Sequence, residues 1–135
     1  MAVRTEPALT EAQAQLFLEP NYGVAAAIRP DGTPQLTVVW VDWDGEHVLF
    51  NTAEGRYKPE YMRRDPRVTV FVMDRESPYR WISVTGHAEL VEEGAADHIH
   101  TLAKKYKGLD RYPLAEGERR LLVRVTPERV NAYNV

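Results

Sequence analysis

The apolar segments in the first half of the chain are joined by short connections rich in turn-forming residues. Pro30-Asp31-Gly32 separates YGVAAAIR from QLTVVWVDW, and Asp44-Gly45 separates QLTVVWVDW from HVLFNT. Parallel strands need a crossover of about a dozen residues or more, whereas antiparallel strands can be joined by turns of this kind. The three segments are therefore predicted to form consecutive antiparallel strands, a meander.

Three further segments have the composition of strands: RVTVFVM, the stretch from Arg80 to about Glu92, and RLLVRVT. The second alternates strictly. Ile82, Val84, Gly86, Ala88 and Leu90 are predicted to face the core, and Trp81, Ser83, Thr85, His87 and Glu89 the opposite side. Closing six strands into a barrel buries the apolar face and removes open edges. We predict a mainly β protein, a six-stranded antiparallel barrel with short helices, in one domain spanning residues 1–135.

Short helices are predicted around these strands. The first covers residues 11–19, with Thr10 as its N-cap and Gln13 completing a capping box. The second is opened by Pro59, which suits a first helical turn, and ends at about residue 64. Between residues 93 and 107 apolar side chains recur at helical spacing, which predicts a third helix with one buried face.

Composition and charge exclude several kinds of protein and site. The formal net charge of −3 argues against a surface that binds DNA or RNA through general phosphate neutralisation. The chain has no cysteine, so neither a disulfide nor a thiolate metal site can form, and its 4 histidines show no metal-ligand spacing. No apolar run suits a membrane span or a signal peptide. We expect a cytoplasmic protein with no metal site and no nucleic-acid or membrane partner.

The segment NTAEGRYKPEYMRRDPRV concentrates positive charge in a chain that is acidic overall. Arg56 and Lys58 lie just after a predicted strand and just before the predicted helix. Their side chains and the free N–H groups of the first helical turn can therefore converge on one anion, for which a phosphate is the obvious candidate. Asn51 and Thr52, at the end of the strand, can add neutral hydrogen bonds.

A plainer interpretation of this segment is that its first two basic side chains are solvated. In that case Arg63 and Arg64 pair with the carboxylates of Glu60 and Asp65, as exposed runs of charge commonly do. The signatures of dinucleotide folds, P-loops, nucleophile elbows and zinc proteases are all missing from the chain, so no common motif decides between the two interpretations.

The meander, NTAEGRYK, MRRDPRVTVFV and RWISVTGHAELVEE follow one another in this order. From about Leu16 to Val130 the order resembles the flavin and deazaflavin split-barrel oxidoreductases, the superfamily of pyridoxamine 5'-phosphate oxidase. The resemblance implies a split β-barrel of the FMN-binding type in which Arg56 and Lys58 bind the cofactor phosphate. Within the superfamily, PDGTPQLTVVW and WISVTGHAEL are similar to the branch that uses the deazaflavin coenzyme F420.

The same resemblance implies a homodimer with two equivalent cofactor sites, each built where the two subunits meet. The strand from Thr37 to Val41 would lie along the cofactor ring. The cofactor-binding residues implied are Thr37, Val38, Val39, Trp40, Asn51, Thr52, Arg56, Lys58 and Trp81. Judged from the residues alone, Trp81 is also compatible with a partly buried core position, and Trp40 with simple filling of the barrel.

The chemistry implied is hydride transfer from reduced F420 to a conjugated small-molecule substrate. No catalytic residue is identified, because a positioned water can supply the proton. The tail VTPERVNAYNV lacks the Arg-x-Pro pattern with which pyridoxamine phosphate oxidases hold their substrate, so that activity is not expected. Two alternatives stay open: an FMN-dependent oxidoreductase, and a non-enzymatic flavin or haem binding protein with His87 as the candidate axial ligand.

Overall fold

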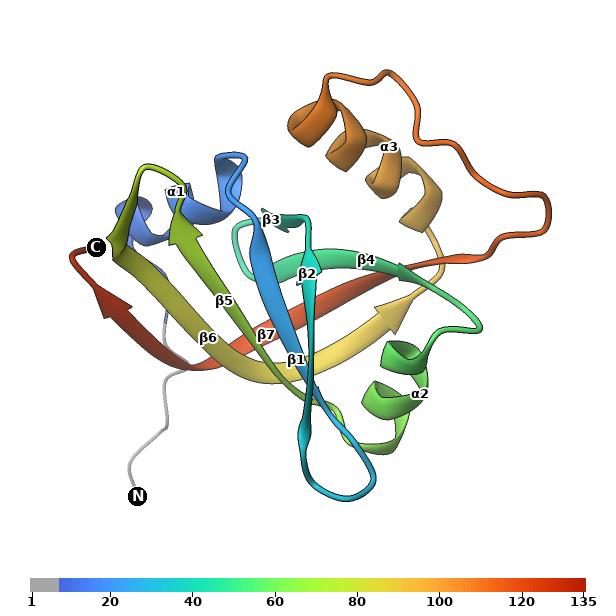
Figure 1. Ribbon diagram of the computed structural model, residues 1–135, viewed down its shortest axis with the longest axis horizontal. Helices are drawn as coiled ribbons and strands as arrows, with labels where there is room; N and C mark the ends of the chain where they lie inside the picture. The colour runs from blue at the N-terminus through green and yellow to red at the C-terminus, as the bar shows by residue number, and fades with distance from the viewer. Residues whose placement is uncertain (1–7) are drawn as a thin grey trace.

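The computed structural model describes residues 8–135 as one curled antiparallel sheet with three helices (Figure 1). The hydrogen-bonded strand order is β2-β1-β5-β6-β7-β4-β3. The strands are β1 (Gly23–Ile28), β2 (Pro34–Val39), β3 (Val41–Trp43), β4 (Val48–Ala53), β5 (Arg67–Asp74), β6 (Ser77–Val91) and β7 (Arg120–Tyr133). The predicted mainly β, antiparallel split barrel is confirmed.

The predicted number of six strands is wrong, because QLTVVWVDW is divided at Trp40 into two strands. On one side of the break Val39 pairs with Gly23 of β1, and on the other Val41 pairs with Phe50 of β4. The resulting β2 and β3 are the two edge strands of the sheet, although a single residue separates them in the chain. The sheet must therefore curl until its edges approach each other, and the opening between them is the split of the barrel.

The interior of the barrel is filled by side chains that alternate along each strand. Val41, Phe50, Val70, Val84 and Val123 have no exposed surface at all. The predicted alternation in β6 is confirmed: Ile82, Val84 and Gly86 are buried and Ala88 and Leu90 half-buried, whereas Trp81, Ser83 and Thr85 are half-buried and His87 and Glu89 exposed. The face that carries the second set lies outside the barrel.

The helices begin and end close to the predicted residues. In α1 (Glu11–Leu18) the Thr10 hydroxyl accepts from the Gln13 N–H at 3.1 Å and the Gln13 side chain accepts from the Thr10 N–H at 3.0 Å, which confirms the capping box. α2 (Tyr57–Arg64) begins two residues earlier than expected, with Pro59 inside its first turn, where no N–H is needed. α3 (Ala95–Lys107) ends at Gly108 in the left-handed conformation.

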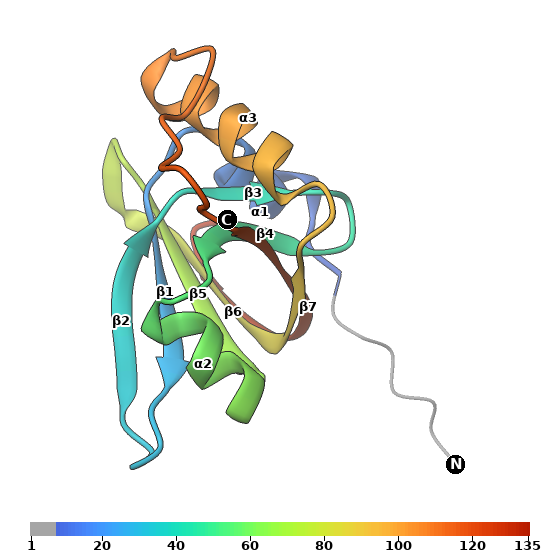
Figure 2. The same cartoon turned by 90° about the vertical axis from the view of Figure 1, so that its right-hand side faces the viewer.

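Figure 2 shows how the helices stand relative to the opening of the barrel. The edge strand β2 lies at the left of the view and the edge strand β3 above β4 near its middle, with α3 at the top and α2 at the bottom. Within residues 8–135 no helix is both long enough and apolar enough to cross a membrane.

Candidate functional site

A cavity of about 400 Å³ lies in the split of the barrel. One wall is the end of β2 together with Trp40, and the other is Asn51 on β4 with the apolar side of α3 and the loop that follows it. Six of the nine cofactor-binding residues predicted from the sequence line this cavity: Val38, Val39, Trp40, Asn51, Arg56 and Lys58. Residues far apart in the chain are thus brought together around one cavity, and their contact with a cofactor remains a prediction.

Arg56 and Lys58 place two positive charges at the end of the cavity beside α2. The Lys58 Nζ donates to the Thr37 hydroxyl at 2.7 Å, and burial, followed by the charge of Arg56, lowers the pKa of Lys58. Within residues 8–135 neither side chain forms an ion pair with a carboxylate. Arg56 is also the N-cap of α2, and among residues 8–135 its side chain does not cap the first N–H groups of the helix. Arg56 is exposed and Lys58 half-buried.

The other arginines of the segment are paired, but not with the expected residues. Arg63 pairs with Glu54 at 2.8 Å, and Arg64 donates to the Pro30 carbonyl oxygen at 3.3 Å. Asp65 pairs with Arg67 at 2.7 Å instead of with Arg64. The expected pairing of Arg63 and Arg64 with Glu60 and Asp65 is therefore wrong.

Three of the predicted residues do not line the cavity. Thr37 is one position before Val38 in β2 and is linked to the site through its bond to Lys58. Thr52 is fully buried, and its hydroxyl has no partner among residues 8–135. Trp81 lies on the outer face of the sheet, where its ring is 5.6 Å from Phe71 and 6.2 Å from Tyr133 between centroids.

His87, the candidate haem ligand, is also outside the cavity. Its ring is more than half exposed and forms an ion pair with Glu128.

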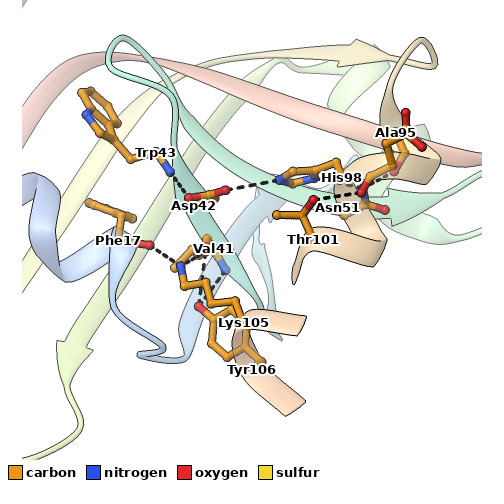
Figure 3. Close-up of polar contacts among 11 residues, drawn as sticks. Phe17, Val41, Asp42, Trp43, Asn51, Ala95, His98, Thr101, Lys105 and Tyr106 are labelled. Atoms are coloured by element: carbon orange, nitrogen blue, oxygen red, sulfur yellow. Dashed lines mark hydrogen bonds and ion pairs between the residues drawn. The ribbon is translucent and has the colours of Figure 1, made fainter. Parts of the chain in front are cut away.

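The last turn of α3 holds the break between β2 and β3 in place. The Lys105 Nζ donates to the Phe17 carbonyl at 2.5 Å and to the Val41 carbonyl at 2.6 Å (Figure 3). The Tyr106 hydroxyl donates to the Asn21 carbonyl at 2.6 Å and accepts from the Val41 N–H at 3.0 Å. Burial lowers the pKa of Lys105 to about 8 and raises that of Tyr106 to about 12. Neither residue was identified from the sequence, because their partners are 64 to 88 positions away.

Aromatic rings cover the cavity wall next to this anchor. The Trp40 ring stacks on Tyr106 with 5.4 Å between centroids and 9° between planes. Tyr112, in the loop after α3, meets Trp40 edge-on at 6.0 Å. The Trp40 ring is thus held in one orientation at the cavity wall, so it does not simply fill the barrel interior.

A second polar network, which contains a buried histidine, joins β3, β4 and α3 behind the cavity. The Asn51 Nδ2 donates to the Ala95 carbonyl at 3.0 Å and to the His98 Nδ1 at 3.1 Å (Figure 3). The His98 Nε2 is 4.0 Å from the Asp42 carboxylate and has no hydrogen-bond partner among residues 8–135. Burial lowers the pKa of His98 to about 4, the positive charge of Lys105 acts in the same direction, and Asp42 opposes both.

The buried imidazole predicts a loss of stability in mild acid. As the pH falls below about 6.5 the unfolded chain binds a proton at His98, whereas the folded chain does so only near pH 4. We expect this group to reduce the free energy of unfolding by about 2 kcal/mol between pH 7 and pH 5. Urea unfolding at the two pH values measures it, with His98→Asn as the matched control that keeps an acceptor for Asn51 and cannot titrate. Equal losses in wild type and His98→Asn contradict the prediction.

The curled antiparallel sheet, open along one side and with a cationic cavity in the opening, defines a split barrel. A family model described as pyridoxamine 5'-phosphate oxidase matches residues 9–134, and the chain belongs to this family.

Solved structures are similar to this chain over most of its length. An F420 reductase is similar with a TM-score of 0.81 and 32% identity, over 91% of this chain and 98% of that one. A conserved hypothetical protein from Mycobacterium tuberculosis has a TM-score of 0.72 and 27% identity, over 98% and 89%. General stress protein 26 from Bacillus anthracis, at 20% identity, shares the fold, with a TM-score of 0.69 over 92% of both chains.

Proposed function

We propose that this protein is an oxidoreductase that uses coenzyme F420 and transfers hydride to a conjugated small molecule. The observation that carries the proposal is the pair Arg56 and Lys58, which faces the cavity of the split with no carboxylate partner in residues 8–135. The similarity to the F420 reductase over 91% of the chain supports the choice of coenzyme.

The residues around the cavity fit a flat, phosphate-bearing cofactor. Arg56 and Lys58, with the N-terminus of α2, would hold the phosphate by charge-assisted hydrogen bonds. β2 is an edge strand, so the N–H and C=O groups on its free side can orient the polar rim of the ring. Side chains of α3 and the Tyr112 ring form the wall opposite β2.

When bound, the deazaflavin would supply a hydride from the ring carbon that replaces the central nitrogen of a flavin. The protein would then bind the cofactor and orient it relative to the substrate. Among the residues that line the cavity there is no carboxylic acid and no histidine. We therefore assign no catalytic acid and expect the proton to come from water.

A homodimer belongs to the same proposal. The outer face of the sheet carries Trp81 together with Tyr133, which is 52% exposed, and the edge strand β2 exposes Leu36 at 62% and Val38 at 68%. Such large exposed apolar groups are typical of surfaces that a partner covers. Because Val38 also lines the cavity, a second subunit on this face would complete the wall of the site.

An FMN-dependent oxidoreductase is the second candidate. The observation in its favour is the match of residues 9–134 to the pyridoxamine 5'-phosphate oxidase model. It would use the same phosphate pair and the same cavity.

Titration of the purified protein with F420 and with FMN tests the two candidates. We expect F420 to quench the tryptophan fluorescence and to bind at least tenfold more tightly than FMN, because ring stacking next to Trp40 changes the emission of that residue. Trp40→Phe is the control, since it should remove most of the quenching and keep the affinity measured by coenzyme fluorescence. Tighter binding of FMN would favour the second candidate, and binding of neither would contradict both.

A further inference from the structure

The guanidinium of Arg120 faces the cavity although it is almost completely buried. Arg120 is the first residue of β7, pairs with Ala53 in the sheet, lines the cavity and is only 5% exposed. Buried arginines are normally neutralised by a well-placed carboxylate, because leaving water costs a charged group several kcal/mol. Its partners therefore decide whether it has a purely structural role.

The protein provides good hydrogen-bond partners for only part of this guanidinium. The Nε donates to the Asn51 Oδ1 at 2.9 Å, and the group lies over the Tyr112 ring at 5.3 Å from its centroid. The Nη1 reaches Glu118 only at 3.4 Å, which is long for an ion pair that is also a hydrogen bond. The Nη2 has no hydrogen bond to any of residues 8–135. The outer edge of the guanidinium, formed by its two Nη atoms, thus has only one long hydrogen bond.

The orientation of the Arg120 guanidinium is fixed by its contacts with Asn51 and Tyr112. Asn51 cannot turn freely, because its Nδ2 is bound to α3 through the Ala95 carbonyl and His98. Its Oδ1 is therefore presented to Arg120, and Tyr112 covers one face of the guanidinium. A planar fork held on one edge and one face is preorganised to bind a second planar group.

Charge in the cavity is strongly one-sided. Four cationic residues line it, Arg56, Lys58, Lys107 and Arg120, and no carboxylate does. Arg56 and Lys58 belong to the start of α2, whereas Arg120 begins β7 and is tied through Asn51 to α3. Within residues 8–135 Glu118 is the one carboxylate that pairs with Arg120, and its contact is long.

We propose that Arg120 is a specificity-determining residue that binds the carboxylate of the substrate, so that the substrates are conjugated carboxylic acids. The inference rests on the proposed function in one respect, because it takes the phosphate at Arg56 and Lys58 to belong to the coenzyme. The substrate carboxylate accepts from Nη2 and replaces the long contact of Glu118 at Nη1. The bidentate geometry matches the planar carboxylate and discriminates against the neutral amide of the same shape.

Cinnamate and cinnamamide are the matched probes, since they are conjugated and differ in charge but hardly in shape. Their dissociation constants are measured by calorimetry, both in F420-saturated protein and in protein without coenzyme. We expect wild type to bind cinnamate at least tenfold more tightly than cinnamamide. Arg120→Gln should abolish this preference, and Arg120→Lys should weaken it, because the charge is kept and the fork is lost. Arg119→Gln, at the neighbouring residue that pairs with Glu92 outside the cavity, should keep it.

The proposal is overturned by equal binding of the two probes to wild type, or by a preference that survives in folded Arg120→Gln. A tenfold loss of F420 affinity in Arg120→Gln also overturns it, since the residue would then serve the coenzyme. Failure of the proposed function is recognised separately. If wild type binds no F420 but the preference for cinnamate depends on Arg120 in protein without coenzyme, the acid subsite stands and the coenzyme assignment falls.

Discussion

Replacing both Arg56 and Lys58 by alanine should weaken the binding of F420 by roughly 3 to 6 kcal/mol, because each charge-assisted contact contributes about 1.5 to 3 kcal/mol. The dissociation constant should rise by a factor of about a hundred or more. Tryptophan and coenzyme fluorescence during titration measures it. The fold should persist, since among residues 8–135 the Arg56 side chain makes no hydrogen bond and the Lys58 side chain only one, to Thr37.

The matched control for this variant removes the same amount of charge from the same segment. Arg63 and Arg67 are paired with Glu54 and Asp65 outside the cavity, so Arg63→Ala combined with Arg67→Ala also changes the net charge by two units. If long-range attraction held the coenzyme, both double variants would weaken binding equally. Equal losses of F420 affinity in the two double variants, or no loss in either, would contradict a phosphate site at the α2 end of the cavity.

Local patterns in the sequence were sufficient to predict the hairpins of the fold. The turn at Pro30-Asp31-Gly32 joins β1 to β2, and the turn at Asp44-Gly45 joins β3 to β4, because these residues favour tight reversals wherever they occur. The alternation in β6 likewise depends only on neighbouring residues. Features of this kind are encoded within a few positions and can be read without tertiary information.

The division of the second predicted strand could not be read in the same way. QLTVVWVDW has an unbroken strand composition, and nothing at Trp40 indicates a break. The break arises because the two halves pair with different partners, β1 and β4, at opposite edges of the sheet. Such a choice is made by the closure of the whole barrel.

The residues of the candidate site could likewise be predicted only where the signal is local in the sequence. Arg56 and Lys58 were found because both lie in one short segment between a strand and a helix. Arg120 and His98 were not, since Arg120 is 69 positions from Asn51 and His98 is 47 positions from it. In the sequence Arg120 looks like one more surface arginine before a strand, and only its burial against Asn51 and Tyr112 distinguishes it.

Of the two glycines in the strands, Gly23 and Gly86, substitution of Gly86 by alanine should lower the free energy of unfolding more. A Cβ at Gly86 would lie 1.8 Å from the Thr126 carbonyl oxygen and 2.8 Å from its carbon, whereas at Gly23 the nearest atom is the end of a Val41 side chain at 2.7 Å. A side chain can turn away, but the backbone of β7 cannot move without opening its pairing with β6.

The contact at Gly86 follows from the irregular register between the two longest strands. Thr85 pairs with Arg129 and Gly86 with Pro127, so Glu128 is an extra residue and β7 bulges toward β6. Adding a methyl group there forces the strands apart, and we expect a loss of about 3 kcal/mol or more in the free energy of unfolding. Urea unfolding curves with an unchanged slope measure it. Gly45→Ala is the control: its φ of +100° strains an alanine but no atom lies within 4 Å, so the expected cost is only about 1–2 kcal/mol. A Gly86→Ala protein as stable as Gly45→Ala would show that β7 yields at the bulge, and that the close approach of these strands is not what fixes the barrel.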